Sequence, residues 1–209
     1  MNRKEFSDLV ESARKATCED NKLPGRDQHR TNRFGIHLSW LWACNGHPGK
    51  RSNVYFYAAR HNSHLKKIEP VIRRAKAHVC RFEFLTDVFV EKYYKKQRTV
   101  TTLLAAEIEA SPNHSVKYGY DGPRRSDYLW DFSKLLYVRA PKRLFVGCTV
   151  KTRMKELICT LARGYSDANC LADASGETAV VLLPGGTTER TEVQLGLANS
   201  GHRLEFAPL

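Results

Sequence analysis

Two glutamates stand close together in a stretch of this sequence that is otherwise apolar. Glu107 and Glu109 belong to the run 103–110, whose other members are leucine, alanine and isoleucine. In a strand, every second side chain points to the same face, so both carboxylates leave the backbone side by side. Like charges removed from water need a cation, a proton or a strong donor, and a divalent metal ion is the commonest functional compensator. The pair therefore predicts a metal site, unless an edge strand turns both glutamates to solvent.

Two further acids precede this pair. Asp87 interrupts the aromatic and β-branched run Cys80–Val90, which predicts a strand. Glu69 lies beside Pro70 in a segment with helical periodicity, 62–78. The predicted strands 80–90 and 99–110 follow each other in the chain, and each carries an acid near one end. The alternative for Asp87 is a turn residue at the end of a short strand.

A lysine follows the pair, on a predicted helix. Ser126 is a suitable N-cap for the helix Asp127–Val138, in which the apolar residues occupy one side. At 100° per residue Asp127, Asp131 and Lys134 share the other side. Lys134 could orient a nucleophile at the acids, or could only pair with an aspartate of its own helix.

The segments around these residues alternate between helical and extended patterns, as in an α/β protein. The length of 209 residues favours one domain. Cys18–Arg33 is expected to be a loop. The segment 34–43 is predicted to be a strand, with a short buried helix as an equal alternative. Helices are predicted at 3–16, 62–78, 127–138, 154–163 and 188–198, and strands at 34–43, 53–59, 80–90, 99–110, 144–149, 178–183 and 203–206.

The chain is strongly basic. It has 34 Lys and Arg against 22 Asp and Glu, a formal net charge of +12. Such an excess favours a polyanionic partner, because contacts to phosphates release counterions; the alternative is lysines that only keep the protein in solution. The expected contacts to a nucleic-acid backbone are the basic residues that flank the acids, Lys92, Lys95, Lys96, Arg98, Arg124 and Arg125.

Other features of the sequence concern the cellular setting. It has no apolar run of about 18 residues, and its first residues are polar. The six cysteines form no C-x-x-C pair, and Cys44 with His47 lacks a second ligand pair for zinc. We expect a soluble, non-secreted, cytoplasmic or nucleoid-associated protein with reduced thiols and no membrane partner.

Three stretches taken together resemble the PD-(D/E)XK nuclease superfamily. They are EFLTD at 83–87, AEIEAS at 106–111 and DFSKLLYVRAPKRLFVG at 131–147. The resemblance covers about 62–149. It implies a restriction-endonuclease-like αβββαβ core within a single α/β domain, a mixed sheet flanked by helices. The N-terminal helix and hairpin and a C-terminal β-α-β unit would then be additions.

The resemblance also implies a site and an activity. Asp87 would match the first metal-binding acid and Glu107 the acid of (D/E)-x-K, with Glu69 as an additional acid on the preceding helix. Glu109 stands where the family usually has lysine, and Lys134 would supply a lysine migrated to the following helix. The implied activity is hydrolysis of DNA with Mg²⁺ or Mn²⁺; a homodimer is left open. The alternative is a module that keeps the fold and binds nucleic acid or protein without catalysis.

Overall fold

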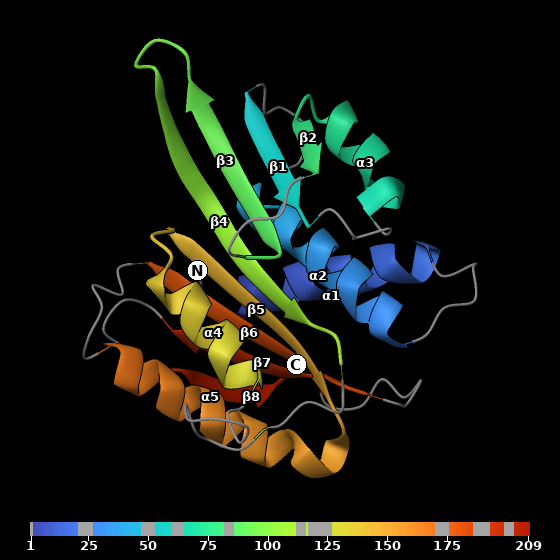
Figure 1. Cartoon of the computed structure of the whole chain (residues 1–209). Helices are drawn as coiled ribbons and strands as arrows, with labels where there is room; N and C mark the ends of the chain where they lie inside the picture. Colours follow the sequence, from blue (N-terminus) through green and yellow to red (C-terminus); the bar gives the residue numbers. More distant parts are fainter. Residues whose placement is uncertain are drawn as a thin grey trace.

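One mixed sheet organises the molecule. The computed structural model describes residues 2–20, 27–46, 53–59, 65–81, 86–111, 116, 127–169, 176–185, 193–198 and 203–209. Within these ranges eight strands lie in the order β2-β1-β3-β4-β5-β6-β7-β8, and helices cover both faces (Figure 1). The predicted α/β class and the mixed sheet flanked by helices are confirmed.

The middle of the sheet is parallel and its sides are antiparallel. β4, β5 and β6 run parallel, whereas β3 is antiparallel to both β4 and β1. β2 adds to β1 in parallel, and β7 and β8 complete the other side in antiparallel fashion. The bounds are β1 Val54–Ala58, β2 His78–Arg81, β3 Val88–Tyr94, β4 Thr99–Glu109, β5 Lys142–Thr149, β6 Glu177–Pro184, β7 Gln194–Ala198 and β8 Glu205–Pro208.

The helices form a layer on each face. α1 (Arg3–Asp20), α2 (Asp27–Ala43) and α3 (Leu65–Arg74) share one apolar cluster with the sheet. On the other face lie α4 (Asp127–Tyr137) and α5 (Met154–Asn169), the latter preceded by the 3-10 turn η3 (Lys151–Arg153). Alternation along β5 feeds both layers, because Leu144 and Val146 join the first cluster and Phe145 the second. β5 is thus buried on both faces, as its apolar sequence predicts.

Several predicted elements differ from those in the structure. The segment 34–43 was expected as a strand, with a helix as the alternative, and it is the second half of α2; the predicted loop 18–33 therefore also contains the start of that helix. The expected N-terminal hairpin is consequently wrong. The single predicted strand 80–90 covers parts of two strands, β2 and β3, which lie on either side of β1.

The C-terminal addition also differs from its prediction. The segment 188–198 was expected to be helical, but its described end forms β7, which pairs with β6 and β8. The addition is therefore a set of antiparallel strands and not a β-α-β unit. Pairing with β6 and β8 on its two sides accounts for the strand conformation of this short segment, which its own pattern did not reveal.

Two further observations concern cysteines and membrane spans. The five cysteines that the structure describes, Cys18, Cys44, Cys80, Cys148 and Cys159, are free thiols, while Cys170 and His47 lie outside the described ranges. Among the described helices, none has the length and apolar character needed to cross a membrane.

Candidate active site

The predicted acids Asp87 and Glu107 meet where β3 begins and β4 approaches its end. Val88 pairs with Ala106 in the antiparallel ladder, so one step further Asp87 and Glu107 stand opposite each other. The backbone N–H of Ile108 donates a hydrogen bond of 2.8 Å to Oδ2 of Asp87. This bond fixes the aspartate across the strand pair. The structure thus brings together the acids from two predicted strands.

Glu107 is a buried carboxyl with an abnormal pKa. Only 5% of its surface is exposed. Its neighbours Ala106 and Ile108, on the other face of the strand, belong to the apolar core. Burial first, and then the charge of Asp87, raises the pKa of Glu107 to about 9. Burial likewise raises the pKa of Asp87, against the opposing hydrogen bond from Ile108. In the protein without a bound cation Glu107 is therefore neutral at pH 7.

Lys134 of α4 reaches this acid pair. Its Nζ lies 3.4 Å from Oε1 of Glu107 and 2.7 Å from Oδ1 of Asp131. Although burial alone lowers the pKa of the Lys134 ammonium, the hydrogen bond to Asp131 and the charge of Glu107 outweigh it and raise the pKa. Lys134 therefore pairs with Asp131 along its own helix and also contacts Glu107, so the alternative that it only pairs along its helix does not hold.

Asp131 is the member of the cluster that the sequence reasoning did not include. It was considered only as a helix partner of Lys134, three residues away, yet its charge also raises the pKa of Asp87 and of Glu107. The available signal was the shared helix face of Asp131 and Lys134. Which strand that face would meet could not be deduced from the spacing.

The position of α4 follows from its apolar stripe and from one buried tyrosine. Leu129 and Phe132 are fully buried, and the ring of Phe132 packs edge-on against Phe145 of β5. The hydroxyl of Tyr128 contacts the carbonyl oxygens of Ser111, after β4, and Cys148, in β5. Burial raises the pKa of Tyr128, which stays a neutral donor. This anchor holds the helix over the end of β4, where Lys134 meets Glu107.

Glu109 shares the face of Glu107 but has a different environment. It stands two residues further along β4, roughly 7 Å at the usual strand rise. Its Oε1 accepts a 3.0 Å hydrogen bond from the backbone N–H of Ser111. Glu109 is half-buried, whereas Glu107 is buried. The prediction that both glutamates face solvent from an edge strand does not hold for Glu107, because β4 has β3 and β5 as neighbours.

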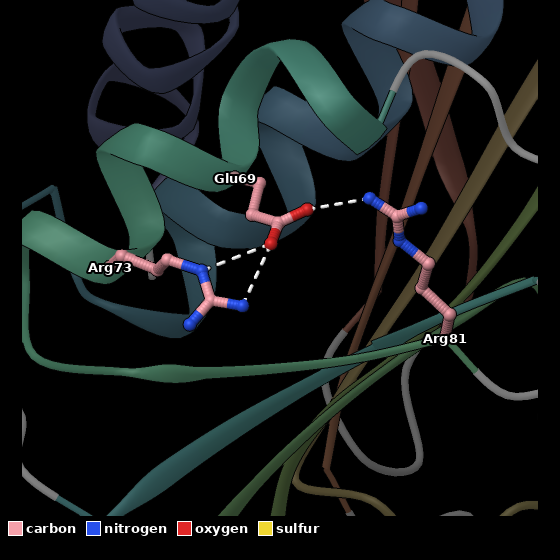
Figure 2. A network of polar contacts seen from close by, with 3 residues as sticks. All are labelled: Glu69, Arg73 and Arg81. Atoms are coloured by element: carbon pink, nitrogen blue, oxygen red, sulfur yellow. Dashed lines mark hydrogen bonds and ion pairs between the residues drawn. The ribbon is translucent and has the colours of Figure 1, made fainter.

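Glu69 is not part of this cluster. α3 packs on the opposite face of the sheet, within the apolar cluster of α1 and α2. Figure 2 shows its carboxylate between two arginines: Oε1 accepts hydrogen bonds of 3.0 and 2.8 Å from Arg73, and Oε2 accepts one of 2.7 Å from Arg81. These bonds lower the pKa of Glu69. The expected metal set of Asp87, Glu107 and Glu69 is therefore not brought together; Glu69 stabilises α3 against β2 instead.

The residues present fit a metal ion in part. Glu107 is buried and Asp87 half-buried, and the Lys134 ammonium lies 3.4 Å from Oε1 of Glu107, so a metal ion would replace the proton that otherwise compensates the second carboxyl. Across the described ranges, however, no group of three or more His, Cys, Asp or Glu side chains has the arrangement of a metal site. Asp87 and Glu107 would be the protein ligands, with water and substrate oxygens completing the coordination.

The predicted phosphate contacts divide into two sets. Lys92 lies in β3, while Lys95, Lys96 and Arg98 form the exposed turn between β3 and β4. Arg124 and Arg125 lie outside the described residues. The four described basic residues therefore belong to one hairpin, at the far end of the strands that carry the acids.

Comparison of this chain with models of protein families, with curated proteins and with solved structures found no match.

Proposed function

We propose that this chain is a Mg²⁺-dependent nuclease that hydrolyses phosphodiester bonds of DNA. The observation that carries the proposal is the cluster of Asp87, Glu107 and Lys134, in which Glu107 is buried and the other two side chains are half-buried. Buried like charges reduce stability. Perturbed ionisable groups gathered in this way are typical of functional sites.

The order of the elements supports the same proposal. α2, β1, β3, β4, α4 and β5 follow one another in a helix-strand-strand-strand-helix-strand order, and their four strands are adjacent in the sheet. α3 and β2 are inserted between β1 and β3. With α3 and β2 counted as an insertion, this order is compatible with the αβββαβ core that the resemblance implies, although it spans 27–149 and not the expected 62–149. Asp87 directly precedes the second of these strands, Glu107 lies on the third and Lys134 on the second helix.

A Mg²⁺ ion would activate water for attack and offset the negative charge that builds on the phosphate oxygens. Asp87 and Glu107 are the carboxylates that would hold it, and binding would displace the proton from Glu107. Ile108 keeps Asp87 oriented through its backbone N–H. Asp131 keeps the Lys134 ammonium charged and directed toward Glu107.

Lys134 and Glu109 would act on the attacking water and on the phosphate. The ammonium of Lys134 would orient the nucleophilic water or stabilise charge on the phosphate, the role usually given to the lysine of (D/E)-x-K. Glu109, roughly 7 Å beyond Glu107 along β4, would accept a proton or contact the metal through water.

Cleavage of supercoiled plasmid in Mg²⁺ or Mn²⁺ tests the proposal. Wild type should nick or linearise the plasmid, and EDTA should abolish the reaction. Asp87→Asn, Glu107→Gln and Lys134→Gln should each lower the cleavage rate by about 100-fold or more. Glu11→Gln, an exposed acid on α1, is the matched control and should cleave like wild type. No cleavage by wild type, or full cleavage by Glu107→Gln, would sink the proposal.

A second candidate, a non-catalytic nucleic-acid-binding or protein-interaction module of the same fold, is favoured by one observation. Among the described residues no group of three or more His, Cys, Asp or Glu side chains has the arrangement of a metal site, and Glu109 replaces the usual lysine. Such a module would bind nucleic acid in EDTA with an affinity that falls as salt rises. Binding that requires the metal ion would count against it.

A further inference from the structure

The hairpin of β3 and β4 extends past the neighbouring strands as a two-stranded ribbon. The ladder of β1 and β3 ends at the pair Val54 and Lys92, with one further hydrogen bond from the N–H of Tyr93 to the carbonyl of Asn53, and β5 pairs with β4 only from Ala105 onward. β3 and β4 continue to pair with each other up to Tyr94 and Thr99. In Figure 1 the connection between the two green strands rises beyond the rest of the sheet, whereas β1 runs beside β3 almost to its end. We call residues 92–102 the ribbon.

The ribbon is exposed and carries only positive charge. All residues from Tyr94 to Thr101 are exposed. It contains Lys92, Lys95, Lys96 and Arg98, and no acidic residue occurs between Lys92 and Ala106. Its remaining residues are tyrosine, threonine, glutamine and valine, which can contact bases and phosphates. This charge is complementary to a polyanion.

The shape of the ribbon selects among polyanions. The register of β3 against β4 shifts between Val90 and Glu91, and such bulges bend and twist the strands beyond them. A two-stranded ribbon is about 10 Å thick through its side chains, against about 12 Å for the width of the B-DNA major groove. The major groove of A-form RNA is too narrow to admit such an element.

Side chains on the ribbon are positioned to contact the major groove of DNA. Lys92 lies over the ring of Tyr94, 4.9 Å from its centroid, and the pairing partners of these residues are Thr101 and Thr99. One face thus presents two hydroxyl-bearing threonines beside a held lysine. Val100, on the other face, is 57% exposed, and apolar side chains contact thymine methyl groups in the major groove.

A cavity at the base of the ribbon extends this surface toward α4. It has a volume of about 370 Å³ and is lined by Thr101, Thr102, Arg139, Ala140, Pro141 and Gly176. The exposed Arg139 follows the end of α4, the helix that carries Lys134. A DNA phosphate at the edge of the major groove would bind to Arg139 at this cavity.

We propose that the ribbon enters the major groove of double-stranded DNA and so makes duplex DNA, rather than RNA or single strands, the polymer that this chain holds. This inference rests on the proposed function, in that the bound duplex is the substrate of the acid site. The tip at Thr99 lies roughly 27 Å along β4 from Glu107 at the usual strand rise. The ribbon would therefore hold the duplex several base pairs away from the cleaved bond.

Binding in EDTA tests the ribbon without any hydrolysis. Fluorescence anisotropy would compare duplex DNA, duplex RNA and single-stranded DNA of one sequence. The variant Lys95→Gln/Lys96→Gln/Arg98→Gln removes three charges from the turn. The matched control Lys66→Gln/Lys67→Gln/Arg74→Gln removes three from α3. Thermal unfolding verifies that both variants fold.

Wild type should prefer duplex DNA over duplex RNA by about tenfold or more, and the ribbon variant should lose most of this preference. Its plot of log affinity against log salt should become shallower by about 3, one unit for each phosphate contact removed. The α3 control should keep the preference. Equal loss in the two triple variants, or equal binding of duplex RNA by wild type, overturns the proposal.

Methylation interference identifies the groove of the duplex that the ribbon contacts. Methylation of guanine N7, in the major groove, should weaken binding of wild type, and the ribbon variant should not respond to it. Interference that is unchanged in the ribbon variant also overturns the proposal. A chain that binds duplex DNA through the ribbon but cleaves none contradicts the nuclease proposal alone, so the two failures are distinguishable.

Discussion

Glu107 combines a buried position, a neighbouring acid and a lysine that is shared with another carboxylate. Each of these features has a cost or a consequence for stability. A buried carboxyl beside Asp87 keeps its proton, and the ammonium of Lys134 is held mainly by Asp131 at 2.7 Å. A residue selected only for stability would be apolar at this position, as its neighbours Ala106 and Ile108 are. Glu107 is therefore better explained by chemistry than by packing.

The raised pKa of Glu107 sets the sign of a pH dependence. Between the ordinary value of 4.5 and about 9, the folded protein holds a proton on Glu107 that the unfolded chain has released. The free energy of unfolding should therefore fall as pH rises through this interval, and the raised pKa of Asp87 acts in the same direction. Urea unfolding across the interval measures the slope.

Removal of the titrating group gives the control for this slope. Glu107→Gln should gain stability relative to wild type as pH rises, by up to about 1.4 kcal/mol per pH unit. Glu11→Gln, whose carboxyl is exposed on α1, should keep the wild-type slope. A wild-type stability that rises across the interval would show that Glu107 is ionised in the folded protein.

Lys134 allows charge to be separated from shape. Lys134→Arg keeps a cation opposite Asp131 but changes its geometry, whereas Lys134→Gln removes the charge. Because the charge of Lys134 opposes the raised pKa of Glu107, the Gln variant should raise that pKa further and move the pH profile of cleavage to more alkaline values. Equal profiles for wild type and Lys134→Gln would mean that the ammonium does not act on Glu107.

At the scale of elements, the close approach of α2 to β4 positions the acids. A Cβ atom on Gly35 would lie 2.6 Å from Cδ1 and 2.8 Å from Cγ1 of Ile108. Ile108 is also the residue whose N–H holds Asp87. The glycine therefore lets a helix on one face of the sheet support a hydrogen bond of the acid pair.

Gly35→Ala tests this approach. A gain of up to about 1 kcal/mol in helix propensity is expected, but the clash with Ile108 should outweigh it and give a net loss of about 1 to 3 kcal/mol in the free energy of unfolding. The double variant Gly35→Ala/Ile108→Val removes the atom at 2.6 Å and should recover part of the loss. Stabilisation by Gly35→Ala alone would show that the helix and strand are not in close contact.

Glu69 belongs to a different element and should behave differently from Glu107. Its two arginine partners are largely exposed, so Glu69→Gln should reduce the free energy of unfolding by less than about 1 kcal/mol. It should leave the cleavage rate unchanged, because α3 lies on the other face of the sheet. Loss of cleavage in this variant would restore the sequence-based expectation that Glu69 binds the metal.

For the molecule as a whole, local patterns predicted the elements that carry the site better than those that surround it. The strand 99–110, the helix from Asp127 and the central strand 144–149 agree with β4, α4 and β5, because each has a strong periodicity or a cap. The segment 34–43 is rich in apolar and aromatic residues, which suit a strand or a buried helix, and in the structure it packs as a helix between α1 and the sheet. β7 is short, and its strand conformation depends on pairing with β6.

A residue of the candidate site could be predicted where the element that carries it has a clear sequence pattern. Glu107 and Lys134 lie on elements whose sequence patterns are clear, whereas Asp87 lies just before β3, in a segment that was predicted as one strand and is divided between two. Asp131 and the departure of Glu69 depend on which faces of two helices meet the sheet, and spacing within a helix does not determine that.

The most direct test measures stability and cleavage on the same preparations of wild type and Glu107→Gln. If the acid serves chemistry, wild type cleaves DNA in Mg²⁺, while the variant unfolds at a higher temperature above neutral pH and loses cleavage by about 100-fold or more. A variant that is less stable than wild type and cleaves equally well, or a wild type that does not cleave DNA, would contradict the account.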